Sequence, residues 1–164
     1  RYWCSWSHRG EGIVTITPYL SPSSASEQVT SIPILTAGTT KTSIISVELP
    51  DVAEGDILVC LAEFEGTNPE SYNVGVWSAL LLAAALDATT GVELSEFNGA
   101  NITPGNHHMT FVKTAMHVVT ASDVTAGRRF VNLVGYARST AAQPGDVLVI
   151  EQDYGRGNVL LVRQ

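Results

Sequence analysis

The 164-residue chain has the length of one domain and is long enough to bury a hydrophobic core without help from a metal or a disulfide. Its net charge is −7, and the segment between Lys41 and Lys113 holds ten acidic residues and no basic one. This charge pattern argues against a nucleic-acid partner, because carboxylates repel phosphates. No apolar run approaches the roughly 20 residues of a membrane-spanning helix, so membrane insertion is not expected.

The chain begins with an aromatic segment, residues 1–12, that includes Tyr2, Trp3 and Trp6. No periodicity is present there, so we expect an irregular amino-terminal arm. Large rings near a terminus pack against the chain's own domain or against a neighbouring subunit, and sugar stacking is a third role for them.

The next segments predict little regular structure before residue 44. Residues 13–17 alternate apolar side chains with threonine and predict a short strand that Pro18 ends. The Ser-rich residues 21–31 predict a loop or an extended segment. We therefore divide the chain into an arm, residues 1–43, and a β-rich core, residues 44–164, whose first strand covers residues 44–49.

A strand is also predicted for residues 57–65, after the turn Glu54-Gly55-Asp56. Its residues are apolar on both faces, which indicates a strand buried on both sides. The following run at residues 78–86 is rich in good helix formers, but the valines just before it favour a long strand. A strand is our prediction there, and a helix over residues 78–87 is the alternative.

Four later segments, separated by turn residues, indicate a meander of strands: residues 107–120, 129–139, 147–154 and 158–163. With the earlier strands they predict an all-β fold, a two-sheet antiparallel β-sandwich of the jelly-roll type. Residues 55–68 also align without gaps with residues 145–158, which suggests two related strands that are each entered through a Gly-Asp turn.

Acidic residues near the ends of these two related strands form the first candidate site. Glu63 and Glu65 share one strand face, Asn68 follows in the turn, and Glu151 and Asp153 are their counterparts in the second strand. If the two strands lie side by side, these oxygens suit a hard cation such as calcium. No recognised calcium loop is present, and solvated carboxylates are the commoner outcome. The same acids are candidates for the acid and base of a glycosidase.

The histidines form a weaker candidate site. On a strand His107 and His117 face one way and His108 the other, and no acidic residue lies between Glu96 and Asp123 to complete a metal site. A pair of turn histidines is the simpler interpretation.

The two cysteines, Cys4 and Cys60, permit one disulfide that ties the arm to a core strand and implies an oxidising compartment or a virion surface. The alternative is that Cys60 is a small buried apolar residue.

Three functions remain open at this stage. The first is a non-enzymatic structural or adhesive domain that self-associates in an extracellular or virion assembly, such as a fibre; scarce charge and the aromatic arm favour it. The second is a carbohydrate-binding module, with calcium as a candidate cofactor, that binds a glycan through Trp3, Trp6 or Trp77. The third is a polysaccharide-processing enzyme, for which no nucleophile or phosphate-binding motif is recognisable.

Overall fold

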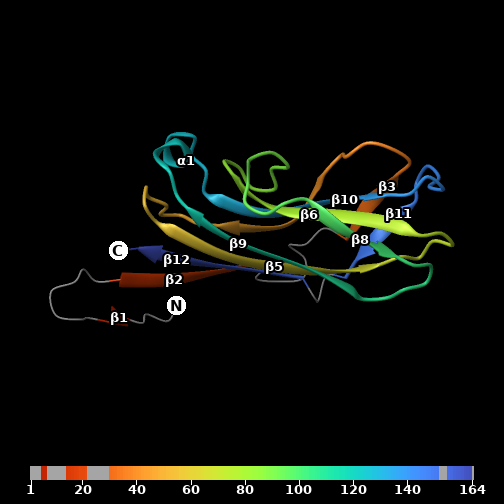
Figure 1. Ribbon diagram of the computed structural model, residues 1–164, viewed down its shortest axis with the longest axis horizontal. Coiled ribbons are helices and arrows are strands. Elements are labelled where there is room, and N and C mark those ends of the chain that lie inside the picture. Colours follow the sequence, from red (N-terminus) through yellow and green to blue (C-terminus); the bar gives the residue numbers. More distant parts are fainter. Residues whose placement is uncertain (1–4, 7–13, 22–29, 152–154, 164) are drawn as a thin grey trace.

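The fold is known from a computed structural model, which describes residues 5–6, 14–21, 30–151 and 155–163. These residues form twelve strands and one short helix, so the prediction of an all-β fold is confirmed (Figure 1). The elements are β1 (Ser5–Trp6), β2 (Val14–Ser21), β3 (Ser31–Leu35), β4 (Thr42–Glu48), β5 (Ile57–Thr67), β6 (Val74–Ala83), β7 (Val92–Glu93), β8 (Asn98–Ile102), β9 (Met109–Val118), α1 (Ala121–Thr125), β10 (Phe130–Arg138), β11 (Val147–Ile150) and β12 (Arg156–Arg163). In this part of the chain, no helix has the length and apolar character needed to cross a membrane.

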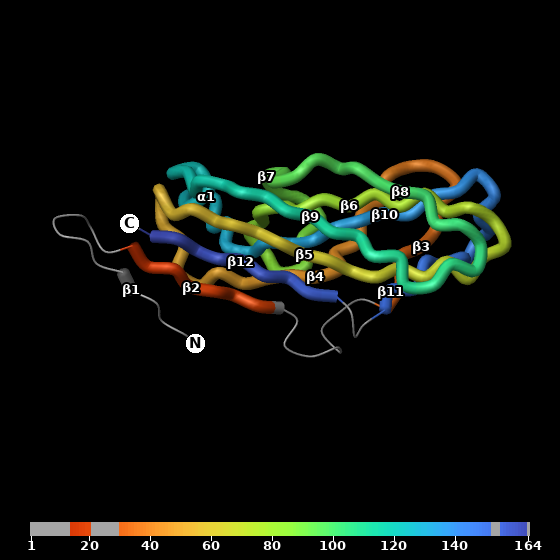
Figure 2. The backbone as a smooth tube through the Cα atoms, turned by 60° about the horizontal axis from the view of Figure 1, so that its bottom comes forward, coloured from red at the N-terminus to blue at the C-terminus, as the bar shows by residue number. Residues whose placement is uncertain are grey.

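Two sets of four antiparallel strands make up most of the sheet. The first set, here called the β5 half, has the order β2–β12–β5–β9. The second set, the β10 half, has the order β4–β10–β6–β8. Figure 1 shows β5 and β9 in one layer and β6 and β10 in another, and Figure 2 shows the four strands of the β5 half side by side.

Strand β3 connects the two halves. Its first residues pair with β11, which continues the β5 half, and its last two pair in parallel with β10. The strands therefore form one continuous mixed sheet, whereas the sequence predicted two separate antiparallel sheets.

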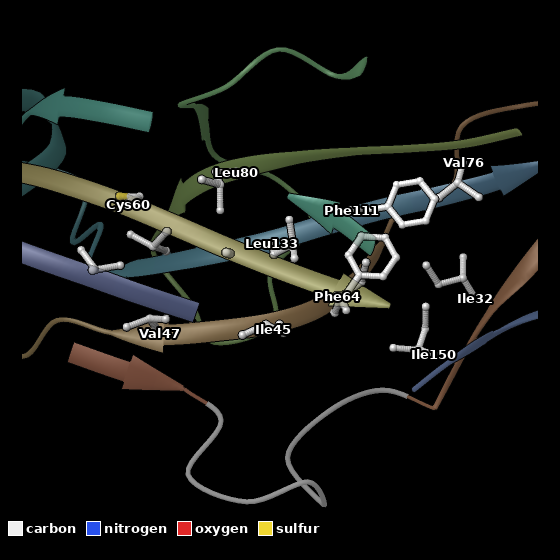
Figure 3. Packing of buried hydrophobic residues seen from close by; sticks show 14 of the residues in the cluster. Ile32, Ile45, Val47, Cys60, Phe64, Val76, Leu80, Phe111, Leu133 and Ile150 are labelled. Atoms are coloured by element: carbon white, nitrogen blue, oxygen red, sulfur yellow. The ribbon is translucent and has the colours of Figure 1, made fainter. Parts of the chain in front are cut away.

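The hydrophobic core lies between the two halves. Leu58 of β5 belongs to this core. Figure 3 shows Cys60 and Phe64 projecting inward from β5, with Leu80 of β6 and Leu133 of β10 opposite them. All five side chains are at most 2% exposed. Burying a large apolar side chain contributes about 1.5–3 kcal/mol, so this interior is the main source of stability.

Residues 78–83 of the run at residues 78–86 lie in strand β6, as predicted, residues 84–86 turn away from it, and the alternative helix is excluded. Strand β6 pairs with β10 along its whole length, from Gly75↔Arg138 to Ala83↔Phe130. Burial in the sheet outweighs the helix propensity of its leucines and alanines, because propensity is a weak preference of a few tenths of a kcal/mol per residue.

The chain itself covers the outer side of the β10 half. Residues 84–97 follow β6: β7 pairs with the edge of β6, where the Leu94 N–H donates to the Leu80 carbonyl at 2.8 Å, and Phe97 packs on Tyr136 of β10 with ring centroids 6.0 Å apart. Beneath this segment, the Asn132 side chain donates to two of its carbonyls, at Ala85 and Ala88. Strands β6 and β10 are consequently buried on both faces.

The prediction that residues 57–65 are buried on both faces is wrong. The inward side chains of β5 are buried, but Val59 and Leu61 on its other face are each 40% exposed. An apolar strand face need not be buried, and no described segment covers the face of β5 that carries Val59 and Leu61.

The predicted meander is also wrong, although its four strands exist. Strand β9 pairs with β5, β10 with β3, β4 and β6, and β12 with β2 and β5, so none of the four pairs with the next along the chain. The reason is that the connections from β9 to β10 and from β10 to β11 cross between the halves, whereas β11 and β12 each pair with β5. The crossing from β9 to β10 contains α1, which was not predicted and which begins at a capping box formed by Thr120 and Asp123.

The amino-terminal part contributes more structure than the predicted arm. Strand β2 runs beside β12 from Thr15↔Arg163 to Ser21↔Gly157, so Pro18 does not end it. A proline is tolerated there because β12 is the only described neighbour of β2 at that point, and proline lacks only the donor for a second neighbour. Strand β3 begins at the last residue of the predicted Ser-rich segment, and it pairs with β11 and with β10.

The internal sequence similarity corresponds to two turns of the same construction. Gly55 and Gly145 have φ values of 87° and 98°, which favour glycine. In both turns the following aspartate accepts a hydrogen bond from the backbone N–H three residues earlier, at 2.8 Å for Asp56 and 2.7 Å for Asp146. The strands that follow, β5 and β11, are antiparallel neighbours.

Candidate functional site

The acidic residues predicted to bind a cation are engaged with neighbours in the β5 half. Glu63 and Glu65 share the outward face, as predicted from their spacing. Glu63 lies 3.9 Å from the Arg156 guanidinium, and Glu65 lies 3.0 Å from Nδ1 of His108. Glu151 accepts a hydrogen bond from the Thr67 hydroxyl at 2.8 Å.

Only part of the predicted cation site comes together. The Glu151 N–H donates to the Glu65 carbonyl at 3.0 Å, so these two residues are adjacent. Asn68, in contrast, is fully buried, and its Nδ2 donates to the Tyr72 and Ile102 carbonyls at 2.8 and 3.1 Å. Asp153 lies outside the described residues. Within the described ranges, no three His, Cys, Asp or Glu side chains are placed to hold a metal ion, and the calcium site stays a prediction.

A cluster around Asp123 was not predicted as a site. Its carboxylate lies 3.0 Å from the His117 ring and 3.0 Å from the Arg128 guanidinium, and it accepts from the Thr120 N–H and hydroxyl. Burial raises the pKa of Asp123, but these hydrogen bonds outweigh it and hold the pKa well below its ordinary value. The signal in the sequence was Thr-x-x-Asp, a helix-start pattern. The cluster fastens β9 to the segment that leads into β10.

A second ion pair closes the same end of the β5 half. The Arg163 guanidinium donates to both carboxylate oxygens of Asp56, at 2.8 and 2.6 Å, and to the Asp51 carbonyl at 2.5 Å. The hydrogen bonds from Arg163 lower the pKa of Asp56 more than burial raises it. This pair ties the end of β12 to the turn before β5.

Cys60 is a free thiol, 2% exposed, that points into the core (Figure 3). Burial raises the pKa of its thiol to about 12, so it stays protonated and unreactive at neutral pH. The disulfide predicted from Cys4 and Cys60 is therefore not formed, and Cys4 lies outside the described residues. The alternative, that Cys60 is a small buried apolar residue, fits its position.

Trp77, a candidate for sugar stacking, is partly buried and has ring contacts within the domain. Its ring stacks on Tyr136 with centroids 5.2 Å apart, and the Arg138 guanidinium lies 5.0 Å from its centroid. Tyr2 and Trp3 lie outside the described residues, and only the backbone of Trp6 is described, in β1.

The largest exposed feature is apolar and was missed by the sequence analysis. It is the outward side of β2, β12, β5 and β9, here called the outer face. Of eleven large apolar side chains exposed in the described residues, nine lie on it: Val14, Ile16, Leu20, Val59, Leu61, Val112, Met116, Val118 and Leu160. The other two, Leu86 and Val124, lie elsewhere. Exposed apolar residues that are gathered in this way mark an interaction surface, whereas scattered ones do not.

Comparisons with known proteins return similarity only at the level of structure. No protein-family model and no curated protein matches the chain. Two similar solved chains come from the T13 IBDV viral particle and from the infectious bursal disease virus Gx strain. Each has a TM-score of 0.51 and 12% sequence identity, and the matches cover 91% and 96% of this chain. The likeness is one of fold. The chain spans only about a third of the two viral chains, 34% and 37% of their lengths.

Proposed function

We propose that this chain is a non-enzymatic structural domain of a virus particle and that it acts by packing against other copies of itself. The observation that carries the proposal is the fold match with chains of a viral particle over more than nine-tenths of this chain. Because identity is 12%, the match supports the architecture, and the function is our inference from it.

The strand order supports a finer description of the architecture. We propose that the two halves are the sheets of an eight-stranded jelly roll, in which β2–β12–β5–β9 faces β4–β10–β6–β8. This is the order expected when a long antiparallel hairpin of strands is wrapped once around a core, so that first and last strands become neighbours. Double-sheet jelly rolls are a frequent architecture of viral shell domains.

The exposed apolar side of the β5 half supports the self-associating part of the proposal. A lone domain that leaves nine large apolar side chains exposed on one face is prone to association. Particle subunits meet this requirement, since their contacts bury such faces.

Analytical ultracentrifugation of the purified chain over a wide concentration range tests the proposal. We expect a discrete oligomer or larger assemblies, and electron microscopy of those assemblies should show a regular arrangement. A chain that sediments as a monomer at every concentration would contradict the proposal.

A further inference from the structure

The outer face is organised in cross-strand rows, two of which are wholly apolar. The β-sheet register places Leu160 beside Val59 and Val59 beside Met116, with Pro18 completing the row on β2. The neighbouring row contains Ile16, Val162, Ile57 and Val118. Cross-strand neighbours on one face are in contact, so these rows form a continuous surface.

The size of this surface suits the centre of a protein–protein contact. Four strands about 4.8 Å apart and about seven residues at about 3.4 Å per residue span roughly 19 by 24 Å. That area of roughly 450 Å² compares with about 800 Å² buried per partner in a stable interface, whose remainder is a polar rim.

The outer face is also the part of the molecule where a second copy meets the least repulsion. Its outward positions carry two acidic residues, Glu63 and Glu65, and one basic residue, Arg156, a net charge of −1, whereas the whole chain carries −7. Two copies that approach through any strongly acidic surface repel each other. A membrane with anionic lipids is disfavoured for the same reason.

The register makes the face self-complementary. Glu63 and Arg156 lie at the same height on the adjacent strands β5 and β12. A two-fold axis parallel to the strands and running between β5 and β12 places β12 of one copy over β5 of the other. Arg156 then lies against the partner's Glu63, and Glu63 against the partner's Arg156, while the row of Val59 and Leu160 lies on its own equivalent.

We propose that the outer face binds the same face of a second copy of this chain, about a two-fold axis that runs along the strands between β5 and β12. The two faces then pack as aligned sheets, and the contact is isologous. This inference rests on the proposed function, since it names the surface through which the chain self-associates.

Charge variants test the two-fold geometry, with sedimentation as the measurement. In the row of Glu63 and Arg156, Arg156→Glu leaves two acidic residues and Glu63→Arg leaves two basic ones, so each variant alone is expected to dissociate about tenfold or more readily than the wild type. Mixing the two variants should restore association, because each acidic row then meets a basic one. This rescue depends on contact between copies, since the pairing within either variant stays broken.

An apolar variant with a matched control tests the surface itself. Met116→Lys changes a side chain that is 75% exposed at the face, and Leu86→Lys makes the same kind of change at a side chain that is 60% exposed elsewhere. We expect about tenfold weaker association for Met116→Lys and no change for Leu86→Lys, and both variants should unfold like the wild type when compared at a concentration at which the chains are monomeric.

The outcomes separate this inference from the proposed function. A wild-type chain that associates and is unaffected by Met116→Lys and by both charge variants overturns the inference alone. A wild-type chain that stays monomeric overturns the proposed function, and the inference falls with it. Co-sedimentation of the wild type, but not Met116→Lys, with phosphatidylcholine vesicles would assign the face to lipid and overturn the inference as well.

Discussion

The two halves of the sheet have similar apolar strands but differ in how their outer sides are covered. In the β10 half, residues 84–97 fold over β6 and β10 and bury both faces of each. In the β5 half, Val59 and Leu61 remain 40% exposed on the outer side. A strand that is apolar on both faces therefore predicts that both faces are buried. In the β10 half the same chain buries the outer face, and in the β5 half, by our inference, a second copy does so.

The largest expected effect compares an inward leucine with an outward one. Leu133→Ala empties a position that is 1% exposed between the halves and should lower the free energy of unfolding by about 2–5 kcal/mol. Leu61→Ala should cost less than about 1 kcal/mol in the monomer, because this side chain is already in contact with water. Urea unfolding measures both, in the Met116→Lys background so that the monomer is compared. Equal losses would show that both faces of β5 are covered after all.

A smaller effect is expected at the junction between the halves. Asp123→Ala removes the carboxylate that accepts from the Thr120 N–H and hydroxyl, and it leaves the His117 and Arg128 side chains without their partner. We expect a loss of about 2 kcal/mol in urea unfolding. Ser122→Ala, one residue earlier and exposed, is the matched control and should stay within about 0.5 kcal/mol of the wild type. If Asp123→Ala lowered the free energy of unfolding as little as Ser122→Ala does, the cluster would not fasten the two halves together.

The smallest of the three effects is a pH dependence carried by the ion pair at the end of the β5 half. The Arg163 hydrogen bonds hold the pKa of Asp56 below its ordinary 3.8. The unfolded carboxyl group therefore takes up a proton before the folded one does, and stability is full above about pH 4 and falls as the pH drops through the folded pKa. Asp56→Asn should reduce this acid-dependent loss, as measured by the melting temperature between pH 6 and pH 2. An identical pH profile in the variant would contradict the assignment, and Asp87→Asn is the control at an exposed carboxylate.

Local features of the fold were readable from the sequence. The period of two placed Glu63 and Glu65 on one face, and the Gly-Asp pairs marked two turns that the structure contains. In the run at residues 78–86 the strand was correctly assigned as far as residue 83, because the valines before the run outweighed its helix formers.

Non-local features were not readable. The pairing of β9 with β5, of β10 with β4 and β6, and of β3 with both halves depends on contacts between distant segments, which turn residues do not encode. The position of Asn68 was not readable for the same reason: it lies one residue beyond β5, and its side chain donates to the Tyr72 and Ile102 carbonyls. The exposure of the outer face could not be predicted, because an apolar strand face does not show whether it is buried by the same chain or by a second molecule.

Lys113 protects the edge strand β9 against the addition of further strands. It lies on β9, which pairs only with β5 among the described strands, yet its side chain is buried and its ammonium group contacts the carbonyl and side chain of Asn98 on β8. An exposed strand edge is a template for runaway fibril formation, and an inward-pointing charge is a known protection against it. A foreign strand that docked on β9 would seal this ammonium group still further from water, which is costly. The β9 edge is thus protected against amyloid-like extension.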